Sequence, residues 1–114
     1  GAPYRYGKAS PRDGFDCSGF VQHVYERHGV YLPRTARKMA SSLPKIEKND
    51  LRSGDLVFFN TNGGRYSHVG LLVKDDDFIH APGRRIGKVL VSSLHNRYWR
   101  KHFTGVRRPG IKSY

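Results

Sequence analysis

The sequence predicts an α+β fold with an antiparallel sheet, because helical patterns come first along the chain and strand patterns follow them. Apolar side chains recur at helical spacing over residues 17–28, and a second, shorter helix is expected to reach about Ser42. From Leu56 onwards, short apolar runs alternate with turn signals, which is typical of strands. The chain has 114 residues, of which 37% are hydrophobic, enough for one modest core. We therefore expect a single domain over residues 1–114.

The first predicted helix begins at the only cysteine of the chain. Asp16 and Ser18 flank Cys17 and supply a plausible N-cap, and Gly29 suits the position that follows a helix C-terminus. The side chains at helical spacing behind the cap are Phe20, Val21, Val24, Tyr25 and His28. The pattern thus predicts a helix from Cys17 to about His28.

Turn residues and apolar runs define the remaining elements. Pro33 breaks the chain, Thr35 can cap the second helix, and Pro44 follows its expected end. Strands are predicted over residues 56–59, 68–73, 78–81, 87–93 and 104–109, the last of them as a closing edge strand. A loop or hairpin is expected over residues 60–67, an acidic turn over 74–77, and a short helix or loop over 94–103.

Basic side chains outnumber acidic ones and are unevenly placed. The formal net charge is +12, and residues 78–114 hold nine Lys or Arg without one Asp or Glu. This asymmetry indicates an acidic partner, whether nucleic acid, anionic lipid or a wall polymer, unless it only keeps the surface soluble. We expect the basic tail, with Arg107 and Arg108, to contact such an acidic partner.

The sequence has no run that approaches the roughly 18 apolar residues of a membrane span. It opens abruptly with GAPYRYG and shows no charged-then-apolar leader. We therefore expect any signal or lipid anchor to lie outside this chain.

A lone cysteine allows no internal disulfide and no zinc–cysteine cluster. Cys17 can be a buried structural residue or a nucleophile. At a helix N-terminus the helix dipole lowers the pKa of a thiol, and the unpaired backbone N–H groups can hold an oxyanion. The placement therefore predicts a low thiol pKa and favours a cysteine acyl-transfer enzyme, in which a histidine arrives from elsewhere in the fold.

Two of the six histidines are the candidates for that partner. His68 begins one predicted strand and His80 closes the next, so antiparallel pairing would bring them together. The others are expected on the surface or, in the case of His28, at a helix end, and they are His23, His28, His95 and His102. A single histidine at a strand end is more often a hydrogen-bonded structural residue than a catalytic one. Two of them on adjacent strands favour a catalytic pair.

Four segments in order, DGFDCSGFVQ, LRSGDLVFF, SHVGLLV and FIHAPG, resemble the NlpC/P60 family of papain-like cell-wall peptidases. The likeness runs from PYRYG to VRRP. It implies that Cys17 is the nucleophile, His68 its base, and His80 the polar residue that orients His68. It also implies a helix bearing the cysteine packed on an antiparallel sheet, and catalysis without a metal or an organic cofactor.

The resemblance further implies substrate contacts. Asp16 and Ser18 would line the cleft, and the hydroxyl of Tyr4 would point toward the oxyanion, with Tyr6 as the alternative because only one glycine follows it here. Members of the family hydrolyse peptidoglycan stem peptides, commonly between D-glutamate and diaminopimelate. The closing SSLHNRYWRKHFTGVRRPG is similar to the tails of single-domain murein endopeptidase lipoproteins, some of which cut the D-alanyl-diaminopimelate cross-link instead. Both bonds stay open.

The function predicted is a peptidoglycan endopeptidase with a Cys-His-His mechanism, monomeric, in the bacterial envelope or secreted. One alternative is a basic module that binds wall polymer or nucleic acid and has a structural cysteine. Nucleic acid is the less expected partner, because no RNP-like motif or recognition helix is present. Another alternative is an amidase or acyltransferase on the same scaffold.

Overall fold

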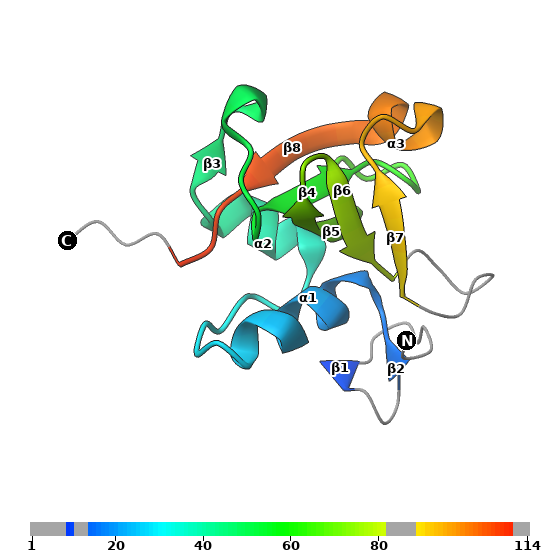
Figure 1. Cartoon of the computed structure of the whole chain (residues 1–114). Helices are drawn as coiled ribbons and strands as arrows, with labels where there is room; N and C mark the ends of the chain where they lie inside the picture. The colour runs from blue at the N-terminus through cyan, green and yellow to red at the C-terminus, as the bar shows by residue number, and fades with distance from the viewer. Residues whose placement is uncertain (1–8, 11–13, 82–88, 111–114) are drawn as a thin grey trace.

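A computed structural model describes residues 9–10, 14–81 and 89–110. Its main feature is a six-stranded antiparallel sheet in the order β3-β8-β4-β5-β6-β7 (Figure 1). These strands are β3 (Lys45–Ile46), β4 (Leu56–Phe59), β5 (His68–Lys74), β6 (Asp77–His80), β7 (Leu90–Ser93) and β8 (Phe103–Arg107). A two-stranded hairpin, β1 (Ala9–Ser10) with β2 (Gly14–Phe15), precedes the first helix.

The helices are α1 (Cys17–Glu26), α2 (Ala36–Ser42) and α3 (Arg97–His102), with a 3₁₀ turn, η1 (Lys48–Asp50). The first two begin where their caps predict, because side-chain oxygens of Asp16 and Thr35 accept hydrogen bonds from first-turn N–H groups. Helix α1 ends two residues earlier than expected, and Gly29, at φ +79°, lies in the turn that follows. Within the described residues, no helix is long and apolar enough to cross a membrane.

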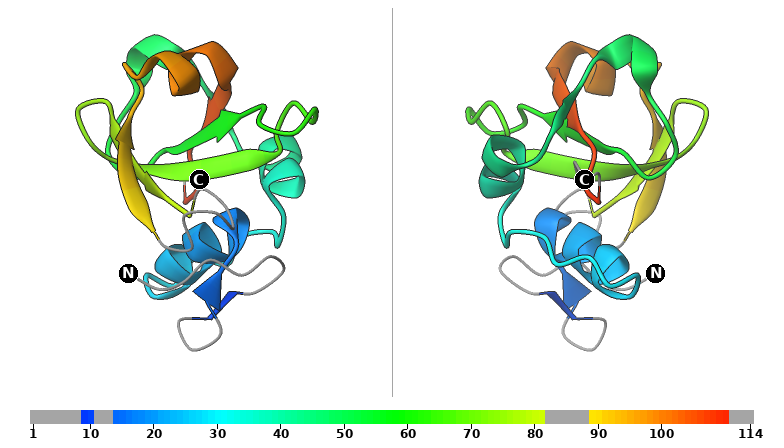
Figure 2. Two further views of the ribbon diagram at one scale, coloured as in Figure 1. Left: turned by 90° about the vertical axis from the view of Figure 1, so that its right-hand side faces the viewer. Right: turned by 90° about the vertical axis from the view of Figure 1, so that its left-hand side faces the viewer.

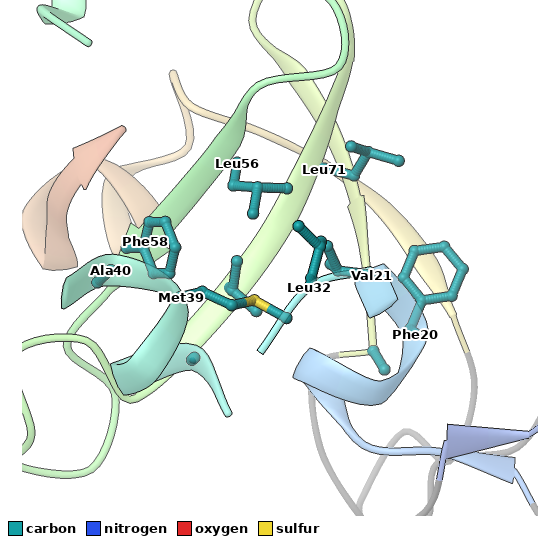
Figure 3. Close-up of a cluster of buried hydrophobic side chains, with 11 residues drawn as sticks. Phe20, Val21, Leu32, Met39, Ala40, Leu56, Phe58 and Leu71 are labelled. Carbon is teal, nitrogen blue, oxygen red and sulfur yellow. The ribbon is translucent and has the colours of Figure 1, made fainter. Parts of the chain in front are cut away.

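One face of the sheet packs against α1 and α2. Alternate residues of the two central strands, among them Phe58 and Val69, bury their side chains against Val21 of α1 and Met39 of α2. Figure 3 shows these helices and strands enclosing the cluster. The core therefore fixes where α1 begins relative to β5.

The opposite face carries a second, more aromatic core. Phe59, Phe78 and Val106 are fully buried there, and Trp99 of α3 packs over them. Both views in Figure 2 place α3 on the far side of the sheet from α1. One face of the sheet thus positions the helix that bears the cysteine. The other face surrounds the strand residues that include the two histidines.

The predicted arrangement of a cysteine-bearing helix on an antiparallel sheet is confirmed. The expected role of the last strand is wrong, because β8 is not an edge strand. It pairs with β4 on one side and with β3 on the other. Strand β3 has only two residues and gives no detectable sequence pattern. The sequence therefore does not indicate that another strand pairs with the outer edge of β8.

Arg107 and Arg108 of the basic tail were expected on the surface, but both are engaged within the fold, while Arg97, Arg100 and Lys101 are exposed. Arg107 is 7% exposed, and its Nε donates to the carbonyl oxygen of Ala40 at 2.7 Å. Arg108 pairs through both Nε and a terminal nitrogen with the carboxylate of Asp55, itself 1% exposed. These two arginines therefore join β8 to α2 and to the start of β4, and they are not available to bind envelope polymers.

Gly70 in the middle of β5 leaves room for the neighbouring strand's side chains. A Cβ at this position would lie 2.6 Å from Cδ2 of Phe78 and 3.3 Å from Cβ of His80. Only glycine fits there without movement of β6.

We expect Gly70→Ala to lower the free energy of unfolding by about 1–3 kcal/mol, because the added methyl group overpacks a closed core. Denaturant titration of the wild type and the variant measures the loss. Lys74→Ala, an exposed change on the same strand, is the control and should stay within about 0.5 kcal/mol. A Gly70→Ala protein as stable as the control would show that β6 moves aside freely.

Candidate active site

The thiol of Cys17 lies beside the strand that begins with His68. The Asp16 carboxylate caps α1 by accepting from the N–H of Gly19 at 2.7 Å, which sets the direction in which the helix begins. From there the thiol sulfur lies 3.9 Å from the carbonyl oxygen of Ser67, the residue before β5. Cys17 and His68 both line one open cavity of about 730 Å³. The structure thus brings the two predicted reactive residues to one site.

His68 and His80 form a buried hydrogen-bonded pair, as the strand pattern predicts. His68 Nε2 lies 2.8 Å from His80 Nδ1, and both rings are almost fully buried. In the register of β5 and β6, Leu71 faces Ile79, so His80 stands opposite Gly70 and diagonal to His68. The missing side chain at Gly70 therefore lets one ring reach the other.

The far nitrogen of His80 continues the chain to β7. His80 Nε2 lies 2.8 Å from Ser92 Oγ. If His68 Nε2 donates to His80 Nδ1, His80 carries its own proton on Nε2 and can donate it to Ser92. His68 Nδ1 is then an unprotonated base. This tautomer is the one in which His68 can take a proton from a thiol.

Aromatic side chains enclose the histidine pair. The indole of Trp99 stacks on His68 with ring centroids 5.4 Å apart and an interplanar angle of 24°, and meets His80 edge-on at 4.8 Å. Phe59 and Phe78 close the sides, at 6.1 Å from His68 and 4.6 Å from His80. These aromatic rings therefore shield the faces of both imidazoles, while His68 still borders the open cavity.

Burial decides the charge of the reactive groups. Loss of solvent lowers the pKa of His68, with a further lowering by the neighbouring His80, and it lowers the pKa of His80 as well. Burial raises the pKa of the Cys17 thiol to about 11 and outweighs the backbone N–H of Val69, which favours the thiolate. The low thiol pKa expected from the helix dipole is therefore wrong. The free site holds a neutral thiol and neutral imidazoles.

Arg34 ties together the two residues that flank the cysteine. Its terminal nitrogens donate to both carboxylate oxygens of Asp16, at 3.1 and 3.0 Å, and to Ser18 Oγ at 2.9 Å. Asp16 and Ser18 are buried and line the cavity as expected. Their contact with substrate stays a prediction, since both side chains are engaged with Arg34.

Sequence reasoning missed three members of this site. Arg34 follows a proline in a loop, Ser92 is one of two serines in a strand, and Trp99 belongs to a basic stretch without clear periodicity. Each reaches the site through tertiary packing, and no local pattern distinguishes them. Tyr4 and Tyr6 lie outside the described residues. Over the described ranges, no group of three or more His, Cys, Asp or Glu side chains is arranged to hold a metal ion.

Comparison with known proteins identifies the family of this chain. The sequence profile of the NlpC/P60 family matches residues 1–108, so the chain belongs to the NlpC/P60 family. It is 44% identical over 112 residues to the murein DD-endopeptidase MepH of Escherichia coli, covering 95% of this chain and 41% of that protein. It is also 44% identical over 110 residues to the probable endopeptidase NlpC of the same organism, covering 95% and 70%.

A solved structure has the same fold. It is a lipoprotein-like protein of the NLP/P60 family from Staphylococcus aureus, which superposes with a TM-score of 0.85 at 36% identity, over 96% of this chain and 37% of that one. The family and fold predicted from the sequence are thus confirmed. The chain spans between 41% and 70% of the length of the two Escherichia coli relatives.

The neutral histidine pair predicts an acid-sensitive fold. Unfolded histidines take up protons near pH 6.5, whereas the folded pair, with its lowered pKa values, does not until lower pH. The free energy of unfolding should therefore fall as the pH falls below 6.5, by about 1.4 kcal/mol per pH unit for each histidine that stays neutral. Denaturant titrations between pH 7.5 and 4.5 measure this slope. His80→Gln should reduce it, while His28→Gln, an exposed control, should not.

The raised thiol pKa predicts slow alkylation at neutral pH. The rate constant for iodoacetamide should climb through a midpoint above pH 9, because only the thiolate reacts and burial disfavours it. Mass spectrometry follows the reaction without ambiguity, since Cys17 is the only thiol. A rate that levels off below pH 7 would mean a thiolate–imidazolium pair and would contradict the neutral site.

Proposed function

We propose that this chain is a cysteine peptidase domain that hydrolyses peptide bonds in peptidoglycan. The observation that carries the proposal is a helix-end thiol and a strand-end imidazole on one open cavity, with the imidazole hydrogen-bonded from behind by a second histidine. The endopeptidase names of the relatives support murein as the substrate. Such a substrate places the activity in the bacterial cell envelope or outside the cell.

The reaction starts from neutral groups. As the Cys17 sulfur bonds to the scissile carbonyl carbon, its proton passes to His68 Nδ1, so that no stable ion pair is needed beforehand. The carbonyl oxygen becomes an oxyanion, and the backbone N–H groups of Cys17 and Ser18 at the positive end of α1 are its candidate donors.

His68 then acts as an acid and as a base in turn. It returns the proton to the leaving amine, which departs and leaves a thioester on Cys17. A water molecule gives a proton to His68 and attacks the thioester, and the carbon–sulfur bond breaks to release the acid product. His68 returns the proton to the sulfur, which restores the thiol and the neutral imidazole. No metal or organic cofactor takes part in this scheme.

His80 has a positioning role in the proposal. By accepting from His68 Nε2–H it fixes the tautomer that leaves Nδ1 free, and it shares the transient positive charge of His68 without taking the proton. Ser92 holds the His80 ring in turn. The stack with Trp99 restricts rotation of the His68 ring.

The bond that is cut can be either the D-alanyl-diaminopimelate cross-link or the D-glutamyl-diaminopimelate stem bond. The name of MepH, a murein DD-endopeptidase, favours the cross-link as the first to be tested. Asp16 and Ser18 are expected to line the cleft and touch the substrate, and Tyr4 to lie near the oxyanion. We expect the domain to act as a monomer.

The proposal is tested by digesting purified sacculi and identifying the new ends by mass spectrometry. Cys17→Ala and His68→Gln should each lose activity by at least about 10⁴-fold, because the first lacks a nucleophile and an amide cannot shuttle protons. His80→Gln and His80→Asn should keep clearly more activity than His80→Ala, since an amide carbonyl can accept from His68.

Two results would count against this function. Retention of most activity by Cys17→Ala would end the cysteine mechanism. Binding of wild-type protein to sacculi without any new chain ends would instead favour a wall-polymer binding module. Equal, severe loss in all three His80 variants would mean that His80 itself carries a proton.

A further inference from the structure

The described lining of the candidate catalytic cavity carries more positive than negative charge. Among the described residues, four charged side chains line it: the carboxylate of Asp16 and the cations of Arg34, Arg37 and Lys38. Asp16 and Arg34 are bonded to one another twice, so this pair adds no net charge. Among the described residues, no Asp or Glu lies within ion-pair distance of Arg37 or Lys38. The cavity wall therefore presents two uncompensated positive charges.

Helix α2 holds these two cations at the cavity. Thr35 caps the helix by accepting from the N–H of Lys38 at 3.2 Å, and Met39 and Ala40 bury the opposite side of α2 in the core. The side chains of Arg37 and Lys38 remain exposed. Their backbone is thus rigid while their charged ends face solvent and the cavity, which is the arrangement of a binding site rather than of a structural ion pair.

Arg37 also reaches the other wall of the cavity. A Cβ placed on Gly64, in the loop between β4 and β5, would lie 3.4 Å from a terminal nitrogen of Arg37. That loop ends at Ser67, whose carbonyl oxygen lies beside the Cys17 sulfur. Figure 2 shows the loop and α2 on the same side of the molecule. The guanidinium therefore lies near the reacting atoms and not at a remote surface.

The position of Arg37 and Lys38 limits the kind of anion that they can bind. Described cavity residues come from segments 16–18, 34–38 and 61–68, so the basic last third of the chain supplies none of them. An anion held there must belong to the molecule that enters the catalytic cavity. A carboxylate matches the planar fork of Arg37, and the ammonium of Lys38 adds a second donor without a geometric demand. Stem peptides carry several carboxylates close to their scissile bonds.

We propose that Arg37 and Lys38 form a carboxylate-binding subsite that selects stem peptides with a free carboxylate beside the bond to be cut. This inference rests on the proposed function, because it names the chemistry that the same cavity selects. The subsite acts on substrate binding, so its loss raises KM and leaves kcat nearly unchanged. Its contribution weakens as salt rises, because both cations are exposed.

The test uses soluble stem peptides of one sequence in four forms. One form has every carboxylate free, and each of the others has one carboxylate converted to the amide, on D-glutamate, on diaminopimelate or at the terminal D-alanine. The enzymes are wild type, Arg37→Gln, Lys38→Gln and the double variant. Arg27→Gln and Lys74→Gln are matched controls, since both remove an exposed cation from helix and strand positions that do not line the cavity.

We expect the double variant to lose about five- to twentyfold in kcat/KM on the free peptide, mainly through KM, while the controls stay within about twofold. Amidation of the recognised carboxylate should lower kcat/KM of the wild type by a similar factor. It should lower kcat/KM of the double variant hardly at all, because that variant has already lost the cations. The amide that produces this pattern identifies which carboxylate is bound. Raising the salt concentration from about 0.05 to 0.5 M should reduce the difference in kcat/KM between the wild type and the double variant.

Binding without turnover separates this inference from the function on which it rests. In a Cys17→Ala background, calorimetry measures the Kd of each peptide with and without Arg37→Gln and Lys38→Gln. Absence of hydrolysis by wild type would defeat the proposed function, yet a Kd that depends on both the cations and one carboxylate would still uphold the subsite. Two results would overturn the subsite. One is a double variant that loses the same factor in kcat/KM on the free peptide and on every amidated peptide, and the other is a double variant whose kcat/KM and Kd equal those of the controls.

Discussion

The hydrogen bond between His68 and His80 is the interaction on which the site depends. It joins two neighbouring strands inside an apolar layer, where the buried nitrogens His68 Nε2 and His80 Nδ1 satisfy one another. Gly70 leaves space for the His80 side chain, Ser92 hydrogen-bonds to the far nitrogen of His80, and Trp99 stacks on the His68 ring. The strand register, the glycine and the aromatic core thus all serve one geometric requirement, which is that the free nitrogen of His68 be held still.

The same burial that secures this geometry sets the electrostatics. A solvent-exposed pair of the same residues would exist partly as thiolate and imidazolium, whereas here desolvation raises the thiol pKa and lowers the imidazole pKa values. In the proposed mechanism, the charge on the reacting atoms is therefore created during the reaction. Of the permanent charges at the cavity, Asp16 and Arg34 are paired with each other, and the Asp16 carboxylate adds to the effect of burial in raising the pKa of the Cys17 thiol.

Local signals made the first half of the site predictable. The Asp16 cap, the helix that starts at Cys17, the strand that begins at His68 and the strand that ends at His80 all follow from short-range patterns. The order of four motifs points to the family. What could not be foreseen depends on long-range packing. Arg34 reaches Asp16 across 18 residues, Ser92 reaches His80 across 12, and Arg107 enters the core beside Ala40 from 67 residues away. A basic residue in a charged tail looks solvated until the fold supplies a carbonyl or a carboxylate to receive it.

The place of β8 in the sheet has a consequence for how the domain is made. This strand is the last of the described elements, yet it lies between β3 and β4, which were synthesised some 50 to 60 residues earlier. Until it emerges from the ribosome, β4 has a bare edge and Asp55 lacks its arginine partner. A nascent or C-terminally clipped chain would carry the cysteine and both histidines but would lack the strand that seals the sheet. The sheet around the proposed active site can therefore close only after residues 103–107 have been made, although every residue proposed to react has been synthesised by then.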